Sequence, residues 1–249
     1  MSRYSAFARF YDNLTSNIDY KKHSEYYVEI IERFGGERNG ILLDLACGTG
    51  SLSEKMSEAG FDVIGVDFSQ EMLSIAIDKK IESGLDVQYL CQDMTRLDMF
   101  GTVDVTICAL DSLNHLDGMS SVQRVFERVS LFSNPDALFI FDMNTIFKHR
   151  NVLSDNIFLY DTPEVYCVWE NEYSEKDSRV DISLTFFECI DGCYKRSSER
   201  FFEKAYDADE ILASLEKAGF EVLATYDYMT TCPFNDNSEK ITFVARKAR

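Results

Sequence analysis

The sequence lacks several features that would each indicate a particular class of protein. No apolar run approaches the roughly 20 residues that a membrane helix needs, and the first residues lack the apolar core of a signal peptide. The seven cysteines include no Cys-x-x-Cys pair, and the closest two are Cys189 and Cys193, which argues against a zinc site and a disulfide framework. We therefore expect a cytoplasmic protein with reduced thiols, no membrane contact and no bound metal.

Positive charge is also scarce. The chain has 25 Lys and Arg against 43 Asp and Glu, a formal net charge of -18, which would repel the phosphates of nucleic acid. Nucleic acid is therefore not expected as a partner. The 249 residues do contain 45% hydrophobic and 13% aromatic residues, enough for the core of one sizeable domain or of a domain with an insert. The sequence indicates no particular oligomeric state.

The most informative stretch is an apolar run, 41–45, that leads into a glycine-containing turn. Gly48 and Gly50 allow the backbone to approach a ligand that side chains would exclude, and a helix beginning after Gly50 would direct free N–H groups toward a carboxylate or a phosphate. Asp67 ends the next apolar run, 17 residues beyond Gly50, where a carboxylate can hold both hydroxyl groups of an adenosine ribose. A glycine turn and an acid at this spacing predict a nucleoside-containing cofactor.

A dinucleotide is the alternative ligand for this turn. Dinucleotide binders use Gly-x-Gly-x-x-Gly, and here Ser53 occupies the third glycine position. A nicotinamide-dependent oxidoreductase is therefore the second hypothesis. In a third, purely structural interpretation, these are ordinary turn glycines and Asp67 is an ordinary helix cap.

Apolar runs typical of buried strands alternate with stretches of helical periodicity through the first 142 residues. Near-continuous apolar character, as in 103–110, indicates strands that are buried on both faces of a sheet. This alternation predicts an α/β fold with a doubly wound, mostly parallel sheet, completed by two strands after a helix over 207–219. The seven expected strands are 41–45, 62–67, 87–91, 103–110, 137–142, 221–228 and 240–246.

The alternation is interrupted after residue 144 by strand-like runs with short polar connections and no intervening helix. These runs are 165–173, 180–190 and 194–202. Asp191-Gly192 is a strong hairpin signal between the last two runs. The block is therefore expected to form a small antiparallel β insert.

This change of pattern predicts two domains. Residues 1–143 and 206–249 would form the cofactor-binding domain with an N-terminal helical cover, and 144–205 would form the antiparallel insert, placed as a substrate lid. Residues 151–205 contain 12 acids against 6 bases. Such a face should disfavour acidic substrates and tolerate cationic or neutral ones, although solvation of the surface explains the same excess.

Residues 44–50, Asp-Leu-Ala-Cys-Gly-Thr-Gly, resemble the first motif of the class I S-adenosylmethionine-dependent methyltransferases, with Ala46 in place of the family's first glycine. The resemblance implies a Rossmann-like methyltransferase fold with an antiparallel last strand, S-adenosyl-L-methionine as the cofactor, and methyl transfer to an N or O atom of a small-molecule acceptor. A non-catalytic cofactor-binding module is a further alternative. Other stretches that resemble a bacterial small-molecule-type branch of the family are 4–12, 66–69, 92–94 and 109–115.

The resemblance also implies cofactor contacts at individual positions. The glycine turn would line the methionine end of the cofactor, Asp67 would bind the ribose hydroxyls, and Phe68, Asp93 and Met94 would surround adenine. Backbone carbonyls after the fourth strand would meet the cofactor's amino group, and Asp44 would support that end from beneath. The expected cofactor-binding residues are Tyr11, Asp44, Ala46, Gly48, Gly50, Asp67, Phe68, Asp93, Met94, Ala109 and Leu110.

The N-terminal segment is rich in aromatic residues. Tyr4, Phe7, Tyr11 and Tyr20 are spaced so that they can form one aromatic face, which would suit both adenine and a sulfonium. In the family branch that the chain resembles, this segment closes over the cofactor, and Tyr11 is the expected contact. A hydrophobic face that packs the segment against the domain is an equally ordinary interpretation.

Methyl transfer requires a nucleophile in line with the sulfonium carbon, so positioning the substrates and excluding water can accelerate it without a covalent residue or a metal. An acceptor that loses a proton needs a base, and His115 is the best-placed candidate, unless it only occupies a loop–helix junction.

Asp111 and Asn144, at the carboxyl edge of the sheet, are candidate substrate contacts. Trp169 could line the substrate pocket or belong to the core of the insert. The other histidines, expected at the surface, are His23 and His149.

Overall fold

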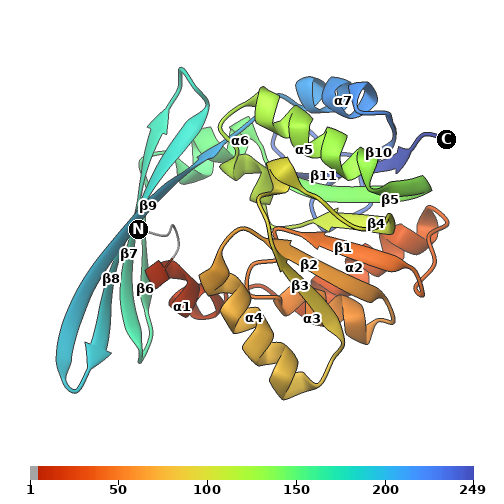
Figure 1. Ribbon diagram of the computed structural model, residues 1–249. Coiled ribbons are helices and arrows are strands. Elements are labelled where there is room, and N and C mark those ends of the chain that lie inside the picture. The colour runs from red at the N-terminus through yellow and green to blue at the C-terminus, as the bar shows by residue number, and fades with distance from the viewer. Residues whose placement is uncertain (1–4) are drawn as a thin grey trace.

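The computed structural model describes residues 5–249 and contains two separate sheets (Figure 1). The larger sheet has seven strands in the order β10-β11-β5-β4-β1-β2-β3, in which β11 is antiparallel to both of its neighbours and the first five strands are parallel. This arrangement confirms the predicted doubly wound sheet with an antiparallel last strand. The strands are β1 (Ile41–Leu45), β2 (Asp62–Asp67), β3 (Val87–Cys91), β4 (Val103–Cys108), β5 (Ser133–Asn144), β10 (Phe220–Asp227) and β11 (Lys240–Lys247).

Helices cover both faces of this sheet because successive residues of its strands point to opposite sides. Leu42 packs with α2 and α3 on one face, whereas Leu43 packs with α5 and α7 on the other. The side chain of Ser69 caps α4 by accepting a hydrogen bond from Met72 N, and Gly84 ends it in the left-handed conformation. The helices are α1 (Ser5–Leu14), α2 (Tyr20–Arg33), α3 (Ser51–Glu58), α4 (Gln70–Ser83), α5 (Met119–Leu131) and α7 (Ala208–Lys217).

A four-stranded antiparallel sheet lies between β5 and α7 in the chain, in the order β6-β7-β8-β9. The Asp191-Gly192 turn joins β8 to β9 as predicted, with φ of 50° and 77°. The short strand β6 was missed by the sequence analysis, and a brief helical stretch precedes it. The elements are α6 (Ile146–Lys148), η3 (His149–Leu153), β6 (Ile157–Asp161), β7 (Val165–Ser174), β8 (Arg179–Ile190) and β9 (Cys193–Lys204).

Helix α1 lies between the four-stranded sheet and α4 (Figure 1). Phe7, Phe10 and Leu14 on its buried face share a core cluster with residues of β7 and β8 and with Met72 of α4. The N-terminal segment therefore connects the two sheets above the carboxyl ends of the parallel strands.

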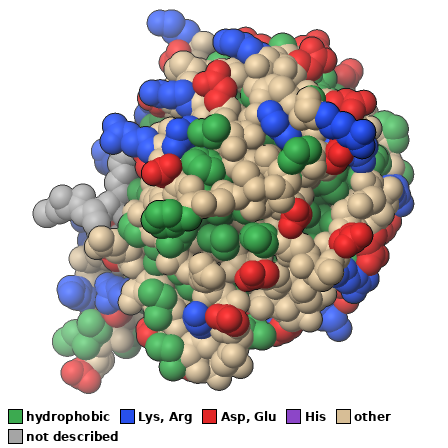
Figure 2. Space-filling model, turned by 45° about the vertical axis from the view of Figure 1, so that its right-hand side comes forward, with side chains coloured by type: hydrophobic (Ala, Val, Ile, Leu, Met, Phe, Trp, Pro, Cys, Tyr) green, Lys and Arg blue, Asp and Glu red, His purple; other side chains and the backbone are tan. Residues whose placement is uncertain are grey.

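The surface carries side chains of both charges (Figure 2). On the face in Figure 2, basic and acidic side chains are interspersed, and no basic patch gathers there. Within residues 5–249, no helix is both long enough and apolar enough to cross a membrane. All seven cysteines are free thiols.

Candidate functional site

The glycine turn between β1 and α3 uses left-handed backbone at three positions: Ala46 (φ 61°), Gly48 (φ 55°) and Gly50 (φ 75°). The two glycines are needed for different reasons. A Cβ on Gly48 would meet no atom within 4 Å, so its α-carbon faces open space, whereas a Cβ on Gly50 would lie 2.3 Å from the Tyr89 hydroxyl. Gly48 therefore leaves room for a ligand, and Gly50 allows the turn to pack against β3.

Asp67 lies at the carboxyl end of β2, beside this turn. Its Oδ2 accepts a hydrogen bond from Gly48 N (2.9 Å) and its Oδ1 accepts one from Ser69 N (2.8 Å). Burial raises the pKa of the Asp67 carboxyl, and the backbone donors oppose that shift. Each carboxylate oxygen has a second lone pair, so this fixed carboxylate can also accept hydrogen bonds from ligand hydroxyls.

Asp44 lies at the end of β1 and is 2% exposed. Its Oδ2 accepts a hydrogen bond of 2.5 Å from Ser53 Oγ. Burial raises the pKa of its carboxyl to about 7, the charge of Asp67 adds to the shift, and the Ser53 hydroxyl opposes it. Asp44 thus lies beneath the glycine turn and lines the same pocket.

The pocket at the turn is enclosed by three parts of the chain: the glycine turn, the end of β4 with Ala109 and Leu110, and Tyr11 and Tyr20 from the N-terminal segment. Burial, then the nearby Tyr20 and Asp111, raise the pKa of the Tyr11 hydroxyl. Tyr11 therefore lies where the sequence analysis expects a cofactor contact. Tyr4, the first member of the expected aromatic face, lies outside the described residues.

A polar contact that the sequence analysis missed holds α1 to the glycine turn. Thr49 Oγ1 donates to Asp12 Oδ1 (2.7 Å), and Lys79 Nζ of α4 lies 2.6 Å from Asp12 Oδ2. Lys79 also donates to Ser51 Oγ (2.7 Å). We call Asp12, Thr49, Ser51 and Lys79 the latch, because they join the covering helix to the turn beneath it.

Phe68, Asp93 and Met94, the residues expected around adenine, follow the neighbouring strands β2 and β3. Phe68 is 47% exposed, an unusual state for so large an apolar side chain, and Met94 is half-buried. The exposed Asp93 caps the short helix η1 (Met94–Arg96) by accepting a hydrogen bond from Thr95 N (2.8 Å). These side chains therefore lie along the edge of the sheet that also carries Asp67.

The chain leaves β4 earlier than predicted, at Cys108 instead of residue 110. Leu110 and Asp111 adopt left-handed backbone, with φ of 56° and 55°. Both conformations are supported by the fully buried carboxylate of Asp142, which accepts hydrogen bonds of 2.8 Å from Leu110 N and from Asp111 N. Tyr27 Oη also donates to Asp142 (3.1 Å). Asp142, at the end of the strand expected over 137–142, thus shapes the loop that lines the pocket.

Beyond this loop lies a group of charged and polar side chains that we call the polar cluster. Lys240 of β11 forms an ion pair with Asp111 and lies 3.7 Å from Asp142. The Asn144 amide donates to Asp111 (3.1 Å) and to Glu203 (2.7 Å), so the structure brings the two predicted substrate residues together. The cluster consists of Asp111, His115, Asp142, Asn144, Lys148, His149, Glu203 and Lys240.

The charges of the cluster act strongly on Asp111. Burial alone would raise the pKa of its carboxyl, but the ammonium groups of Lys240 and Lys148 lower that pKa to about 2. The Asp111 carboxylate is therefore ionised at neutral pH.

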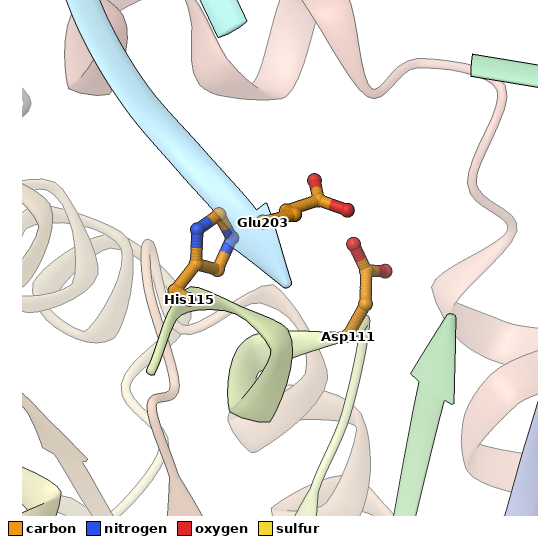
Figure 3. A group of neighbouring side chains, drawn as sticks. All are labelled: Asp111, His115 and Glu203. Carbon is orange, nitrogen blue, oxygen red and sulfur yellow. The ribbon is translucent and has the colours of Figure 1, made fainter. Parts of the chain in front are cut away.

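His115 ends the short helix η2 (Ser112–His115) and points toward the carboxylates of the cluster (Figure 3). Its Nδ1 lies 3.1 Å from the carbonyl oxygen of Phe202, which can only accept, so the neutral ring carries its proton on Nδ1 and a lone pair on Nε2. One ligating atom each from Asp111, His115 and Glu203 lies within 4.8 Å of the others. The end of β9 therefore brings Glu203, which the sequence analysis missed, beside His115.

The remaining predictions concern Trp169, His23 and His149. Trp169 donates from Nε1 to Asn171 (2.7 Å), and its ring lies 6.4 Å from that of Phe201, whose ring is 5.5 Å from His115. Trp169 is thus one aromatic ring removed from the cluster. The surface positions expected for His23 and His149 are wrong, because His23 is 9% exposed and His149 is completely buried.

Comparisons with known proteins agree with this geometry. A family model described as a methyltransferase domain matches residues 42–135. The chain is 32% identical over 246 residues to a candidate methyltransferase of Geobacillus sp. (strain WCH70), covering 98% of this chain and 99% of the relative. It is also 32% identical over 248 residues to YqeM of Bacillus subtilis (strain 168), named as a candidate methyltransferase, with coverage of 99% and 98%. The crystal structure of an S-adenosylmethionine-dependent methyltransferase from Clostridium acetobutylicum ATCC 824 matches with a TM-score of 0.89 at 33% identity and covers 99% of both chains.

Proposed function

The chain belongs to the class I S-adenosylmethionine-dependent methyltransferases, and from this premise we propose that it methylates a nitrogen or oxygen atom of a small molecule bound at the polar cluster. S-adenosyl-L-methionine supplies a methyl group on a positively charged sulfur. The observation that carries the proposal is the position of His115 and Asp111 directly beyond Ala109 and Leu110, which line the pocket at the glycine turn. Helix α1 and the four-stranded sheet cover this region, which favours a small acceptor over a macromolecule.

The residues around the glycine turn fit the cofactor. Asp67, held by two backbone donors, would accept the ribose hydroxyls, and Gly48 leaves space beside them. Ala46, Gly50 and Asp44 would shape and support the methionine end, and Tyr11 would cover it. The loop and edge residues that complete the proposed binding site are Phe68, Asp93, Met94, Ala109 and Leu110.

His115 is the proposed general base. The carbonyl of Phe202 orients its ring, so that Nε2 can take the proton that the acceptor loses on methylation. Asp111, Asn144 and Trp169 would contact or enclose the acceptor. Residues 144–205 would act as the substrate lid, and residues 1–143 and 206–249 would form the cofactor-binding domain. The free thiols support a reducing, cytoplasmic location.

Calorimetric titration with S-adenosylmethionine, S-adenosylhomocysteine and reduced nicotinamide dinucleotides tests the cofactor site. We expect the first two to bind and the nicotinamides not to bind. Asp67→Ala should weaken S-adenosylmethionine binding at least about tenfold, or roughly 1.4 kcal/mol, because two charge-assisted hydrogen bonds are lost. Asp62→Ala, at the exposed start of the same strand, is the control. Binding of nicotinamides alone would overturn the cofactor assignment, and unchanged affinity of Asp67→Ala would overturn the ribose contact.

A further inference from the structure

The polar cluster carries more negative than positive charge. Its carboxylates belong to Asp111, Asp142 and Glu203, and its ammonium groups belong to Lys148 and Lys240. Three carboxylates therefore face two ammonium groups. Because charges removed from water need partners, one additional positive charge would balance the cluster.

Glu203 is the carboxylate that has no lysine or arginine at ion-pair distance within the described residues. Its side chain is 6% exposed, and it accepts a hydrogen bond from the neutral amide of Asn144. Lys240 is already paired with Asp111, and Lys148 donates to Asn144 Oδ1 (3.0 Å) and acts on Glu203 without forming an ion pair with it. Within residues 5–249, no lysine or arginine forms an ion pair with Glu203.

His149 provides a second, independent observation. Its Nδ1 lies 3.3 Å from the carbonyl oxygen of Ser178, so the neutral ring carries its proton there and presents a lone pair at Nε2. That Nε2 is buried, has no hydrogen-bond donor, and lies 3.5 Å from Glu203 Oε2. In the neutral form of His149, two acceptors face each other in a buried place, an arrangement that a positively charged donor nearby would satisfy.

The position at which an additional positive charge would lie is next to His115, the proposed base. Figure 3 shows that the carboxylates of Asp111 and Glu203 face each other while the ring of His115 lies to one side of them. A divalent metal would meet the ammonium group of Lys240 on Asp111, so the cluster suits a singly charged ion better. The excess of acids over bases in residues 151–205 acts in the same direction.

We infer that the methyl acceptor is a primary or secondary amine that binds as its ammonium ion, with Glu203 as the residue that selects the amine. The inference rests on the proposed methyl transfer at this site. One N–H proton of the ammonium passes to His115 Nε2, which frees the nitrogen lone pair. The nitrogen then bonds to the methyl carbon while the carbon–sulfur bond breaks and its electron pair stays on sulfur.

The test uses a panel in which each amine is matched by the hydroxyl compound of the same skeleton. Methyl transfer is measured with S-adenosylmethionine, and binding is measured by calorimetry in the presence of S-adenosylhomocysteine. We expect amines to bind and to be methylated, and their hydroxyl counterparts to bind at least tenfold more weakly. Glu203→Gln should raise KM for the amine at least tenfold, change kcat less, and leave S-adenosylmethionine affinity unchanged. Glu172→Gln, exposed on the same sheet, makes the same charge change as a control.

Four results would overturn the inference while the cofactor still binds. These are equal use of hydroxyl compounds and amines, no binding or methylation of any amine, an unchanged KM in folded Glu203→Gln, and tight binding of Mn²⁺ or Zn²⁺ that Glu203→Gln abolishes. The comparison of amine and hydroxyl compounds uses the wild-type protein, so it decides the matter even if the variant does not fold. Failure of the wild-type protein to bind S-adenosylmethionine would instead contradict the proposed function.

Discussion

The two halves of the site are built in different ways. The cofactor half has at its centre backbone N–H groups and carboxylates from one stretch, 44–69, to which other parts of the chain add covering residues. The acceptor half, the polar cluster, relies on charged side chains from distant parts of the chain, such as Asp111 and Lys240, which are 129 residues apart. Local backbone geometry leaves a motif in the sequence, whereas charge pairing between distant residues, such as Asp111 and Lys240, does not.

The two halves also differ in how their surroundings shift the pKa of a carboxyl group. Asp44 is fully buried and Asp111 is partly buried, and burial without a cation raises the pKa of Asp44 to about 7, whereas two lysines lower that of Asp111 to about 2. One residue type therefore has opposite effects on stability in the two halves. Substitutions in each half test this difference.

The largest expected effect is on stability and follows from Asp142→Ala in the acceptor half. The change leaves Leu110 N, Asp111 N and the Tyr27 hydroxyl without their acceptor and reduces the negative charge around Lys240. We expect a loss of about 5 kcal/mol in the free energy of unfolding, measured with urea.

Asp67→Ala is the matched change in the cofactor half and should cost less than about 1 kcal/mol. Burial already disfavours the Asp67 carboxylate, so removal of its charge offsets the two lost hydrogen bonds. Equal losses of stability in the two variants would remove the energetic contrast between the halves.

The next effect is a pH dependence that comes from Asp44. Its folded-state pKa of about 7 is above the unfolded value of about 3.9, so between these pH values the folded protein binds more protons than the unfolded chain. Stability should therefore fall as pH rises from 4 to 7, by at most about 4 kcal/mol from this residue, and then level off. The lowered pKa of Asp111 has the opposite effect on stability, which rises with pH. This rise is confined to the range between about pH 2 and pH 3.9.

Asp44→Asn should abolish the decrease that Asp44 causes while keeping the hydrogen bond from Ser53. Urea unfolding of the wild-type protein, Asp44→Asn and the exposed control Asp62→Asn at pH 5 and pH 8 measures it. A pH dependence of Asp44→Asn that matches the wild type would contradict the assignment.

The third effect concerns turnover. His115→Asn should lower kcat about 100-fold because the acceptor loses its base, while the affinity for S-adenosylmethionine stays unchanged. Asparagine can still donate to the carbonyl of Phe202, so the loop should keep its shape. The measurement is kcat and kcat/KM across pH, and wild-type values throughout would exclude His115 as the base.

The smallest effect concerns the latch. Asp12→Asn weakens the ion pair with Lys79 and should raise the dissociation constant of S-adenosylmethionine about threefold, since the pair is partly exposed. Calorimetry of this variant beside Glu25→Gln, which breaks an exposed pair of α2, measures the difference. Equal affinity in both variants would mean that the latch does not hold the cover in place.

The strands differ in how clearly their residues mark where they begin and end. The bounds of β3 agree with the prediction because its apolar run ends at a polar loop on both sides. The short strand β6 was missed because five residues beside a brief helical stretch carry too little periodicity. The end of β4 was placed two residues late, since Leu110 continues the apolar run but leaves the strand when Asp142 takes its N–H.

Hydrophobic periodicity and backbone geometry within short stretches were enough to predict the doubly wound sheet and a nucleoside-binding glycine turn with Asp67, and the resemblance of residues 44–50 to a family motif implied the cofactor class. The contacts of Glu203 and Lys240 with Asp111 and His115, and the contact of Asp12 with the glycine turn, depend on tertiary packing. A buried charge is stabilised by any partner that the fold brings within a few ångströms. The separation of two residues in the sequence does not reveal whether they form such a pair.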